Sequence, residues 1–329
     1  MTFDYNRAFS RNLGLVTADE QIEISKKTIA IAGMGGVGGV HLLTLARMGF
    51  QKFHIADMDR FEVENFNRQV GASMSTVGKE KAEVMRQKVL DINPQAEIVV
   101  FSKGVDEDNL EEFLDGVDVY LDGLDFFVLD IRKKLFQRAH EKGIYAVTAG
   151  PIGVSTAFLV FDPKGMSFEE YFQFEKAHTQ HDKAVHFLLG SSPKISHRKH
   201  IVDNSTVRLN QKKGPSLSVS CQAASAAAGA EILKIVLGRG KVNYVPWAQQ
   251  LDLYENKYHK TYNWMGNKSP INRIKLKTSD MYKDFVEKIN KFNPDIIFAS
   301  IVEDTFPIFI NFMKLIKDSK IQCLAGGVF

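Results

Sequence analysis

A glycine-rich turn between an apolar strand and an apolar helix constrains this chain more than any other feature. Residues 28–50 read TIAIAGMGGVGGVHLLTLARMGF. The glycines of the turn are Gly33, Gly35, Gly36, Gly38 and Gly39. They let the backbone approach a phosphate closely, and the helix that follows offers unpaired N–H groups at its positive end. A second apolar run ends at Asp57, where a nucleotide-binding βαβ unit places an acid on the ribose hydroxyls. The segment predicts a nucleotide site.

The polar residues after Asp57 indicate which kind of nucleotide binds. A glycine-rich turn alone is typical of nicotinamide- or flavin-dependent dehydrogenases. Here Arg68 and Lys81 follow, and a dinucleotide with only a pyrophosphate does not require two such cations. A triphosphate attacked at its α-phosphorus does, because charge develops on the phosphoryl oxygens and the leaving pyrophosphate. The alternative is that both side chains are solvated surface charges, as most Arg and Lys are.

Several motifs in order resemble the adenylating-enzyme superfamily that includes ThiF, MoeB, ubiquitin-activating enzymes and tRNA threonylcarbamoyladenosine dehydratases. They are GMGGVGG (33–39), DMD (57–59), NFNRQ (65–69), VGKEK (77–81), INP (92–94) and DGLD (122–125). The resemblance covers roughly residues 5–270. It implies that Mg-ATP adenylates a carboxylate and releases pyrophosphate. That carboxylate is usually the C-terminal glycine of a ubiquitin-like or sulfur-carrier protein or peptide, and in the dehydratase branch it belongs to a modified tRNA base.

The resemblance also implies roles for individual residues. The expected nucleotide contacts are Gly33, Gly35, Gly36, Gly38, Asp57, Asp59, Asn65, Arg68, Lys81 and Asp122. Asp57 would bind the ribose with Asp59 beside it, although the two could also be a solvated pair at a strand end. Arg68 offers a bidentate fork to the triphosphate, and Lys81 a point charge that can follow the pyrophosphate. Lys79 is the competing lysine in that turn.

The expected magnesium ligand is Asp125, because a hard carboxylate beside two phosphate oxygens suits Mg²⁺. Asp122 is the nearest alternative. Relatives usually have Asn after this aspartate, whereas this chain has Phe126. The catalytic set is completed by an N-terminal arginine that crosses a dimer interface to the γ-phosphate, for which Arg11 is favoured over Arg7. The alternative is a surface arginine. If the arginine acts in trans, the active unit is a homodimer.

A base is not required for this reaction, because the carboxylate substrate is already ionised and catalysis consists of positioning and charge stabilisation. No CxxC pair is present, so the structural zinc of ThiF- and MoeB-like proteins is not expected. Residues 150–217 contain no cysteine, and Cys221 is interpreted as a buried core thiol. Adenylation without a covalent cysteine step is therefore predicted.

Strand-like runs at 28–33, 52–57, 97–102, 117–122 and 144–149 alternate with helical segments around 37–48, 79–91, 107–115 and 127–142. This alternation predicts an α/β fold, a Rossmann-like doubly wound and mostly parallel sheet. An antiparallel extension follows, with strands at 154–161 and 249–254, and an alanine-rich helix over 220–237 closes at Gly238. Residues 176–217 are polar and His-rich without a clear period, and we expect a long crossover loop there.

The histidines of this loop, in HTQH (178–181), at His186 and in HRKH (197–200), have three interpretations: a Zn or Ni site, contacts to an acidic substrate, or no role. The second domain is predicted over 271–329, after an adenylation domain over 1–270. Its residues 292–329 resemble the start of the cobalamin-binding domain of some radical SAM proteins, and a local α/β addition is the alternative. We expect helices at 282–290 and 306–316 and strands at 295–300 and before Gly326.

Composition sets the remaining expectations. Two cysteines, the lack of an apolar leader and the lack of a bilayer-length apolar run indicate a cytoplasmic protein without a membrane partner. A net charge of +3 does not argue for nucleic acid by itself. Support for tRNA comes only from the basic residues Lys194, Arg198, Lys199, Lys212 and Lys213. The rival hypotheses are a carrier-protein adenylyltransferase, a tRNA threonylcarbamoyladenosine dehydratase-like enzyme, and an NAD-dependent oxidoreductase or non-catalytic nucleotide-binding scaffold.

Overall fold

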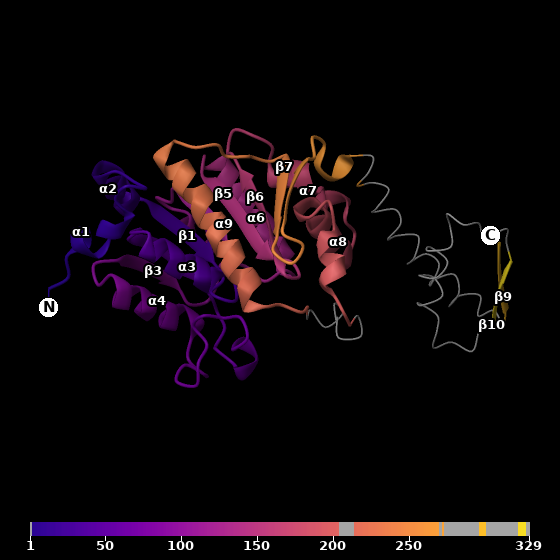
Figure 1. The fold of residues 1–329 in the computed structure, drawn as a ribbon, viewed down its shortest axis with the longest axis horizontal. Coiled ribbons are helices and arrows are strands. Elements are labelled where there is room, and N and C mark those ends of the chain that lie inside the picture. Colours follow the sequence, from indigo (N-terminus) through magenta and orange to yellow (C-terminus); the bar gives the residue numbers. More distant parts are fainter. Residues whose placement is uncertain (1, 204–213, 270–271, 273–295, 301–321, 327–329) are drawn as a thin grey trace. The chain divides into compact units, whose positions relative to one another are not determined.

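The computed structural model describes residues 2–203, 214–269, 272, 296–300 and 322–326. Its contacts divide the chain into two units, Met1–Ser269 and Pro270–Phe329. The larger unit is a sheet covered by helices on both faces (Figure 1). Each unit is described by itself below.

The larger unit is built on one eight-stranded sheet with the order β3-β2-β1-β4-β5-β6-β7-β8. The parallel strands are β1 (Thr28–Ala32), β2 (Lys52–Ala56), β3 (Glu97–Phe101), β4 (Val119–Asp122) and β5 (Tyr145–Pro151). The antiparallel strands are β6 (Ser155–Phe161), β7 (Trp247–Asp252) and β8 (Lys257–Tyr262). The sheet confirms the predicted Rossmann-like fold with an antiparallel extension.

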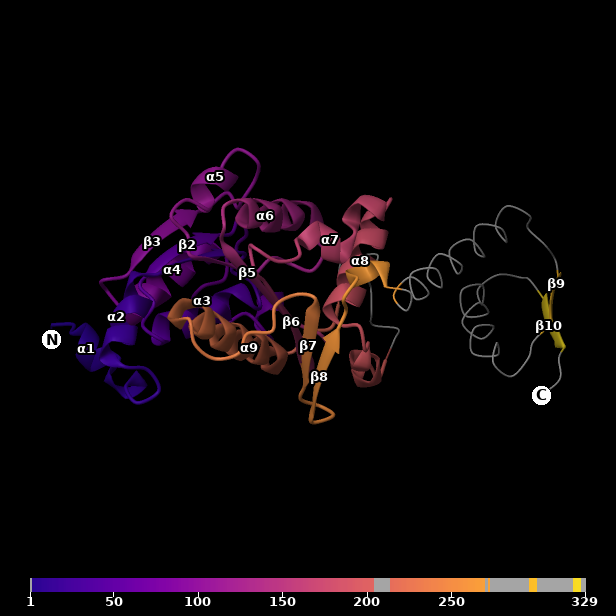
Figure 2. The same ribbon diagram turned by 90° about the horizontal axis from the view of Figure 1, so that it is seen from above.

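Helices lie on both faces of the sheet (Figure 2), and a cluster of buried apolar residues lies beneath them on each face. The first core packs α3 (Gly38–Arg47), α4 (Lys81–Ile92) and α9 (Ser218–Leu237) on one face. The second core packs α5 (Leu110–Phe113), α6 (Leu129–Glu141), α7 (Phe168–Phe172) and α8 (Gln180–Ser191) on the other. The chain enters through α1 (Tyr5–Ala8), the 3₁₀ turn η1 (Ser10–Asn12) and α2 (Ala18–Lys26). Because β1 lies between β2 and β4, buried on both faces, its residues Ile29–Ala32 are all apolar.

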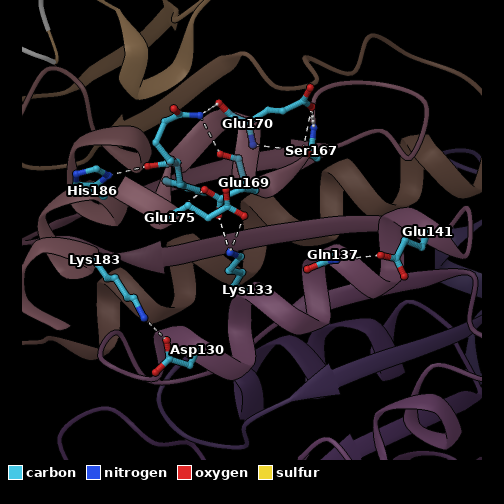
Figure 3. Close-up of polar contacts among 12 residues, drawn as sticks. Asp130, Lys133, Gln137, Glu141, Ser167, Glu169, Glu170, Glu175, Lys183 and His186 are labelled. Atoms are coloured by element: carbon cyan, nitrogen blue, oxygen red, sulfur yellow. Dashed lines mark hydrogen bonds and ion pairs between the residues drawn. The ribbon is translucent and has the colours of Figure 1, made fainter. Parts of the chain in front are cut away.

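The prediction of a structureless crossover over 176–217 is wrong for much of that segment. The structure places η3 (Phe174–Lys176), α8 and η4 (Ser196–His200) there. Thr179 and Asp182 form a capping box that begins α8. Lys183 of α8 pairs with Asp130 of α6 at 2.5 Å, as Figure 3 shows, and α8 buries Phe187 and Leu189. Tertiary contacts of this kind give a polar segment a helix that its periodicity does not reveal.

The last strands of the sheet also differ from the prediction. The strand expected over 249–254 is β7, which runs over Trp247–Asp252, and the edge strand β8 was not expected. Its sequence KYHKTY is polar or aromatic at every position and is exposed or half-buried throughout. A strand at the edge of a sheet does not need an apolar face. Its sequence therefore lacks the run of apolar residues by which central strands are recognised.

Helix α9 confirms the expected alanine-rich helix and ends at Gly238 with a φ of 62°. Within the described residues it is the one helix with the length and composition of a membrane span, contrary to the expectation that no run reaches that length. It packs against β5, β6 and α3. Core helices of α/β domains have the same length and composition, so this property needs no membrane to explain it.

The smaller unit contains the parallel pair β9 (Ile296–Ser300) and β10 (Gln322–Gly326). Strands were expected at both places. The helices expected over 282–290 and 306–316 lie outside the described residues. The resemblance of this unit to a cobalamin-binding domain stays a prediction.

Candidate active site

The predicted site residues lie at one edge of the sheet, at the carboxyl ends of β1, β2 and β4. In the register of these strands, Ala32 of β1 pairs with Ala56 of β2 and with Asp122 of β4. The next residues along each strand are Gly33, Asp57 and Gly123. Ligands of doubly wound sheets bind at such carboxyl ends, where the loops diverge.

Three glycines at this edge are required by packing. A Cβ added to Gly38 would lie 1.7 Å from the carbonyl oxygen of Gly33. A Cβ on Gly33 would lie 2.4 Å from the oxygen of Gly123, and Gly33 has a φ of 90°. A Cβ on Gly123 would lie 2.7 Å from the oxygen of Gly33. These glycines hold β1, α3 and β4 in direct backbone contact, so their role is first of all structural.

Gly35 is different, because it has open space above it. A Cβ added there would meet only the Gln69 amide nitrogen, at 3.7 Å. In the described part of the chain, the backbone N–H groups of Gly35, Gly36 and Val37 donate no hydrogen bond. They lie at the N-terminus of α3, whose first residue is Gly38. Open space beside unpaired N–H groups at a helix N-terminus is the arrangement that accepts a phosphate.

Asp57 is held in place by the glycine turn itself. Its Oδ2 accepts from the backbone N–H of Met34 at 2.6 Å, and its Oδ1 from that of Asp59 at 2.8 Å. Burial raises the pKa of the Asp57 carboxyl, while the Met34 and Asp59 N–H groups oppose the shift. These bonds fix the carboxylate at the end of β2, where the sequence predicted a ribose contact. That contact stays a prediction.

Lys81 is a buried cation at the start of α4, with 6% of its surface exposed. Its Nζ lies 2.9 Å from Oδ2 of Asp59, and its backbone N–H bonds the Asp59 carbonyl. The Asp59 side chain is 65% exposed. Lysines are rarely buried unless they are paired. Among the described residues, the single partner of this buried ammonium is an exposed carboxylate, so the lysine is suited to accept a further anion. Lys79, the competing lysine, is exposed, and its carbonyl accepts from Phe61.

Arg68 lies over the glycine turn. Its Cγ and Cδ would be 3.5 and 3.6 Å from a Cβ added to Gly36, and its guanidinium bonds the Glu64 carbonyl and the Asn67 side chain. Asn65 shapes the turn that carries Arg68, because its Oδ1 accepts from the N–H of Glu62 at 3.0 Å. The structure therefore brings Arg68 to the phosphate turn and gives Asn65 a local structural bond.

The loop after β4 is organised by Arg132, a residue that the sequence did not single out. Arg132 is 2% exposed, and its Nε lies 2.8 Å from Oδ2 of Asp122. The same carboxylate oxygen accepts from Thr148, and Oδ1 accepts from the N–H of Leu124. Asp122 is thus buried and bonded within the chain. Its predicted contact with the nucleotide remains a prediction.

The guanidinium of Arg132 also holds the loop that carries Asp125. Its terminal nitrogens donate to four backbone carbonyls, those of Leu124, Asp125, Phe126 and Val128. The Asp125 side chain is exposed, and its Oδ1 accepts from the N–H of Phe127 at 3.0 Å. On the other side, the guanidinium lies 4.6 Å from the ring centre of Phe187 on α8. Arginine has the donors to satisfy all these groups at once.

Comparison with known proteins identifies the family. A sequence model of the ThiF family matches residues 9–269. The chain belongs to the ThiF family. Together with the relatives below, this membership confirms the predicted superfamily and identifies an adenylyltransferase-like protein.

Similar curated proteins include two kinds of ThiF-family enzyme. The tRNA threonylcarbamoyladenosine dehydratase of Bacillus subtilis is 38% identical over 119 residues, 36% of this chain and 46% of the relative. That of Escherichia coli is 34% identical over 128 residues, 38% of this chain and 46% of the relative. A probable molybdopterin-synthase adenylyltransferase of Porphyra purpurea is 30% identical over 126 residues, 38% of this chain and 33% of the relative. The chain spans about half the length of the curated relatives it matches.

Solved structures share the fold of this ThiF-family chain. Escherichia coli MccB with AMPCPP and MccA has a TM-score of 0.61 and 19% identity, covering 82% of this chain and 75% of that chain. The Escherichia coli dehydratase TcdA has a TM-score of 0.52 and 22% identity, covering 71% of this chain and 95% of that chain. At these identities the likeness concerns the fold.

The N-terminal arginines of this ThiF-family chain lie at the other end of α3 from the glycine turn. Asn12, next to Arg11, donates to the carbonyl of Met48, the residue that follows α3. Arg11 and Arg7 are both exposed. A ten-residue helix is about 15 Å long, so Arg11 is not brought to the turn of its own chain. Its action on the nucleotide stays a prediction, and it requires a second copy.

Cys221 lies beneath the glycine turn as a buried thiol. Its Sγ would be 3.3 Å from a Cβ on Gly36, and none of its surface is exposed. Burial raises the pKa of this thiol, against the opposing effects of Ser216 and Arg68. The thiol is consequently protonated and poorly nucleophilic at neutral pH.

Two of the histidines predicted to lie in a crossover loop, His186 and His200, make structural contacts. The Nδ1 of His186 lies 2.9 Å from the Phe172 carbonyl, and His200 accepts from Val154 and contacts Asp252. His197 is buried, and burial lowers its pKa to about 4. His178 and His181 are exposed. Over the described ranges, no three His, Cys, Asp or Glu side chains gather as a metal site. The Zn or Ni interpretation therefore has no support there.

Proposed function

We propose that this chain is an ATP- and Mg²⁺-dependent adenylyltransferase that converts a carboxylate into an acyl-adenylate. The observation that carries the proposal is the buried Lys81, paired with Asp59, together with the open turn at Gly35 that Asp57 bonds through Met34. Arg68 lies over the same turn. Two cations and unpaired N–H groups at one sheet edge suit a triphosphate better than the pyrophosphate of a dinucleotide.

The proposed reaction needs charge stabilisation rather than a base. A carboxylate oxygen of the substrate attacks the α-phosphorus, and the bond from that phosphorus to the bridging oxygen of pyrophosphate breaks. The electron pair leaves with pyrophosphate, whose charge Lys81 and Arg68 stabilise. No proton has to be removed, because the attacking carboxylate is ionised at neutral pH. Exclusion of water from the site would protect the acyl-adenylate from hydrolysis.

Asp125 would hold the magnesium ion, which neutralises phosphate charge when it is bound. The fit rests on the chemistry of the donor: Asp125 presents an exposed carboxylate after β4, on a loop fixed by Arg132. Magnesium commonly takes one or two protein carboxylates and completes its shell with phosphates and waters.

For the substrate, we favour a modified tRNA base over the C-terminal glycine of a carrier. Three similar curated proteins, from Bacillus subtilis, Haemophilus influenzae and Escherichia coli, are tRNA threonylcarbamoyladenosine dehydratases. Such a substrate would present its carboxylate on the threonyl group of the base. The second candidate is a ubiquitin-like or sulfur-carrier protein or peptide, which the Porphyra purpurea relative supports at 30% identity. In either case, we propose a homodimer in which Arg11 of one copy reaches the nucleotide of the other.

Exchange of labelled pyrophosphate into ATP tests the proposal, with magnesium present and each candidate substrate added in turn. The substrates are tRNA carrying threonylcarbamoyladenosine and a carrier protein ending in Gly-Gly. We expect exchange with the tRNA, and a loss of at least tenfold in Arg68→Ala, Lys81→Ala and Asp125→Ala. Lys164→Ala, an exposed lysine after the antiparallel strand β6 and therefore at the opposite edge of the sheet from the site, is the matched control and should exchange normally.

The outcomes separate the hypotheses. Exchange with the carrier alone would replace the tRNA substrate by the second candidate. Full exchange in both Arg68→Ala and Asp125→Ala would refute the assigned site. Absence of exchange together with tight binding of a nicotinamide dinucleotide would favour the oxidoreductase.

A further inference from the structure

The edge strand β8 exposes one face that no helix covers among the described residues. Helix α9 packs on β5 and β6, and Figure 2 shows β7 and β8 beside it. Ala248 of β7 belongs to the core on the opposite side of the sheet. Because side chains alternate along a strand, Trp247 and its cross-strand partner Tyr262 point to the side of the sheet on which α9 lies.

This uncovered surface, the β8 face, consists of Trp247, Tyr258, Lys260 and Tyr262. Tyr258 and Tyr262 are 54% and 55% exposed. The rings of Trp247 and Tyr262 have centroids 4.7 Å apart, and the Lys260 ammonium lies 4.2 Å from the centre of the Trp247 ring. The face is therefore a row of aromatic rings with a cation at its centre. Its residues alternate along β8 at positions 258, 260 and 262, which is the pattern of one sheet face.

Further cations lie at the turn of the hairpin. The 3₁₀ turn η4 carries the exposed Arg198 and Lys199. His200 anchors η4 to the hairpin, because its Nε2 lies 3.1 Å from Asp252 and its ring 5.1 Å from that of Tyr254. Lys199 reaches Glu255 at 4.0 Å, a distance at which an exposed pair contributes little. The turn of the hairpin, at one end of the β8 face, thus carries two exposed cations.

The β8 face begins at the edge of the sheet that carries the glycine turn. Strand β7 runs parallel to β5, since each is antiparallel to β6. The end of β7 and the start of β8 consequently share an edge with the ends of β1 and β4. From Lys257 to Tyr262 the strand extends about 17 Å, and β7 lies three strand spacings, about 14 Å, from β4. A polymer lying along β8 could therefore place one unit over the nucleotide site.

The chemistry of the face favours nucleic acid over a protein partner. Protein interfaces are depleted in lysine at their core, where Lys260 stands here, and β8 carries no aliphatic side chain. Unpaired nucleotides stack on exposed aromatic rings while nearby cations neutralise their phosphates. We propose that the β8 face, with Arg198 and Lys199 at one end, binds the unpaired nucleotides that flank the substrate base of an RNA. This inference rests on the proposed adenylation of a tRNA base.

The test uses the full chain and a labelled tRNA stem-loop with an unmodified seven-nucleotide loop. Its affinity is measured by fluorescence anisotropy at several salt concentrations. The chain has two tryptophans, Trp247 in the face and Trp264, 62% exposed, just beyond it, so quenching of intrinsic fluorescence reports binding at this place. We expect Tyr258→Ala/Tyr262→Ala to weaken binding at least tenfold. Lys260→Ala should weaken it and make it less dependent on salt.

Matched variants keep the result interpretable. Tyr258→Phe loses the hydroxyl that bonds Gln249 but keeps the ring, so it should bind RNA like the unaltered chain. Lys103→Ala removes an exposed lysine beyond the opposite edge strand and should also bind normally. Unchanged RNA affinity in Tyr258→Ala/Tyr262→Ala would overturn the inference, as would quenching by a Gly-Gly carrier protein but not by RNA.

The inference and the proposed function can fail separately. Pyrophosphate exchange driven by a short soluble threonylcarbamoyl nucleoside needs the nucleotide site but not the β8 face. If the Tyr258→Ala/Tyr262→Ala variant keeps this exchange and loses RNA, both stand. If the unaltered chain binds RNA through the β8 face but shows no exchange, the face stands and the adenylation proposal falls.

Discussion

Replacing Arg132 by methionine should destabilise the larger unit strongly. Methionine is unbranched and similar in length, so it keeps much of the packing against Phe187 while removing the guanidinium. The change leaves the Asp122 carboxylate, also 2% exposed at its side chain, without its cation. It also removes the donors to the four backbone carbonyls of residues 124, 125, 126 and 128.

The expected loss of unfolding free energy depends on which charged and polar groups stay buried without a partner. Removing one partner of a buried ion pair costs about 3–5 kcal/mol, because the remaining charge is uncompensated. Thr148 and the Leu124 N–H still bond Asp122 and reduce that penalty, whereas the freed carbonyls add to it. We therefore expect a loss of about 4 kcal/mol. Domains of this kind have about 5–15 kcal/mol of stability, so the variant should still fold.

Urea unfolding followed by circular dichroism measures this cost, and a double-mutant cycle assigns its cause. Asp122→Asn removes the charge that Arg132 compensates, so Arg132→Met/Asp122→Asn should be more stable than the two single losses predict. Arg132→Lys should recover part of the ion pair but not the four carbonyl bonds. A loss below about 1 kcal/mol in Arg132→Met, the range of an exposed pair, would refute the reasoning.

Three further predictions follow from the site. Gly35→Ala should fold normally, since its Cβ enters open space, and should lose ATP affinity at least tenfold because that space is where we propose that a phosphate binds. Gly38→Ala should fail to fold, because its Cβ meets the Gly33 oxygen at 1.7 Å. Thermal melts and ATP titration distinguish the two variants. Cys221→Ala should keep pyrophosphate exchange, because burial raises the pKa of this thiol and makes it a poor nucleophile. The unaltered chain should show no thioester with the substrate on non-reducing gels. Loss of exchange in Cys221→Ala would contradict this. Burial lowers the pKa of His41 to about 4, so the folded chain holds it neutral while the unfolded chain protonates it below about 6.5. The free energy of unfolding is therefore unaffected by His41 above that pH and falls, by up to roughly 3 kcal/mol, as the pH drops toward 4. In His41→Met, the urea midpoint should depend less on pH between pH 5 and 7.5 than in the unaltered chain.

Local patterns were sufficient to predict the parallel half of the sheet. Central strands such as Thr28–Ala32 are apolar on both faces, and the helix ends carry their own signals, as Gly238 does after α9. The glycine turn also predicts a phosphate site, and its function stays a prediction, although the N–H groups at Gly35 and Gly36, unpaired within the described residues, suit it. In these places the sequence neighbours of a residue decide its structure.

The rest depended on contacts that form only in the folded chain. Arg132 was not singled out, because most of its partners are backbone carbonyls of the loop directly before its helix, and backbone acceptors leave no trace in side-chain composition. Asp122 was read as a nucleotide neighbour from its motif, whereas its burial and its bond to Thr148 depend on β5. The His-rich segment was taken for a loop because the bond of His186 to the Phe172 carbonyl can be seen only in the folded chain.

If a nucleotide binds beside Lys81 as proposed, its phosphate takes the place of the Asp59 carboxylate that pairs with this lysine. A phosphate that reaches the Lys81 ammonium must displace a carboxylate that already lies 2.9 Å away. Asp59 is mostly exposed, so it can turn into water and recover its hydration. The lysine thus keeps a counter-ion before and after binding, and the protein does not have to hold a bare cation in its interior while it waits for the nucleotide.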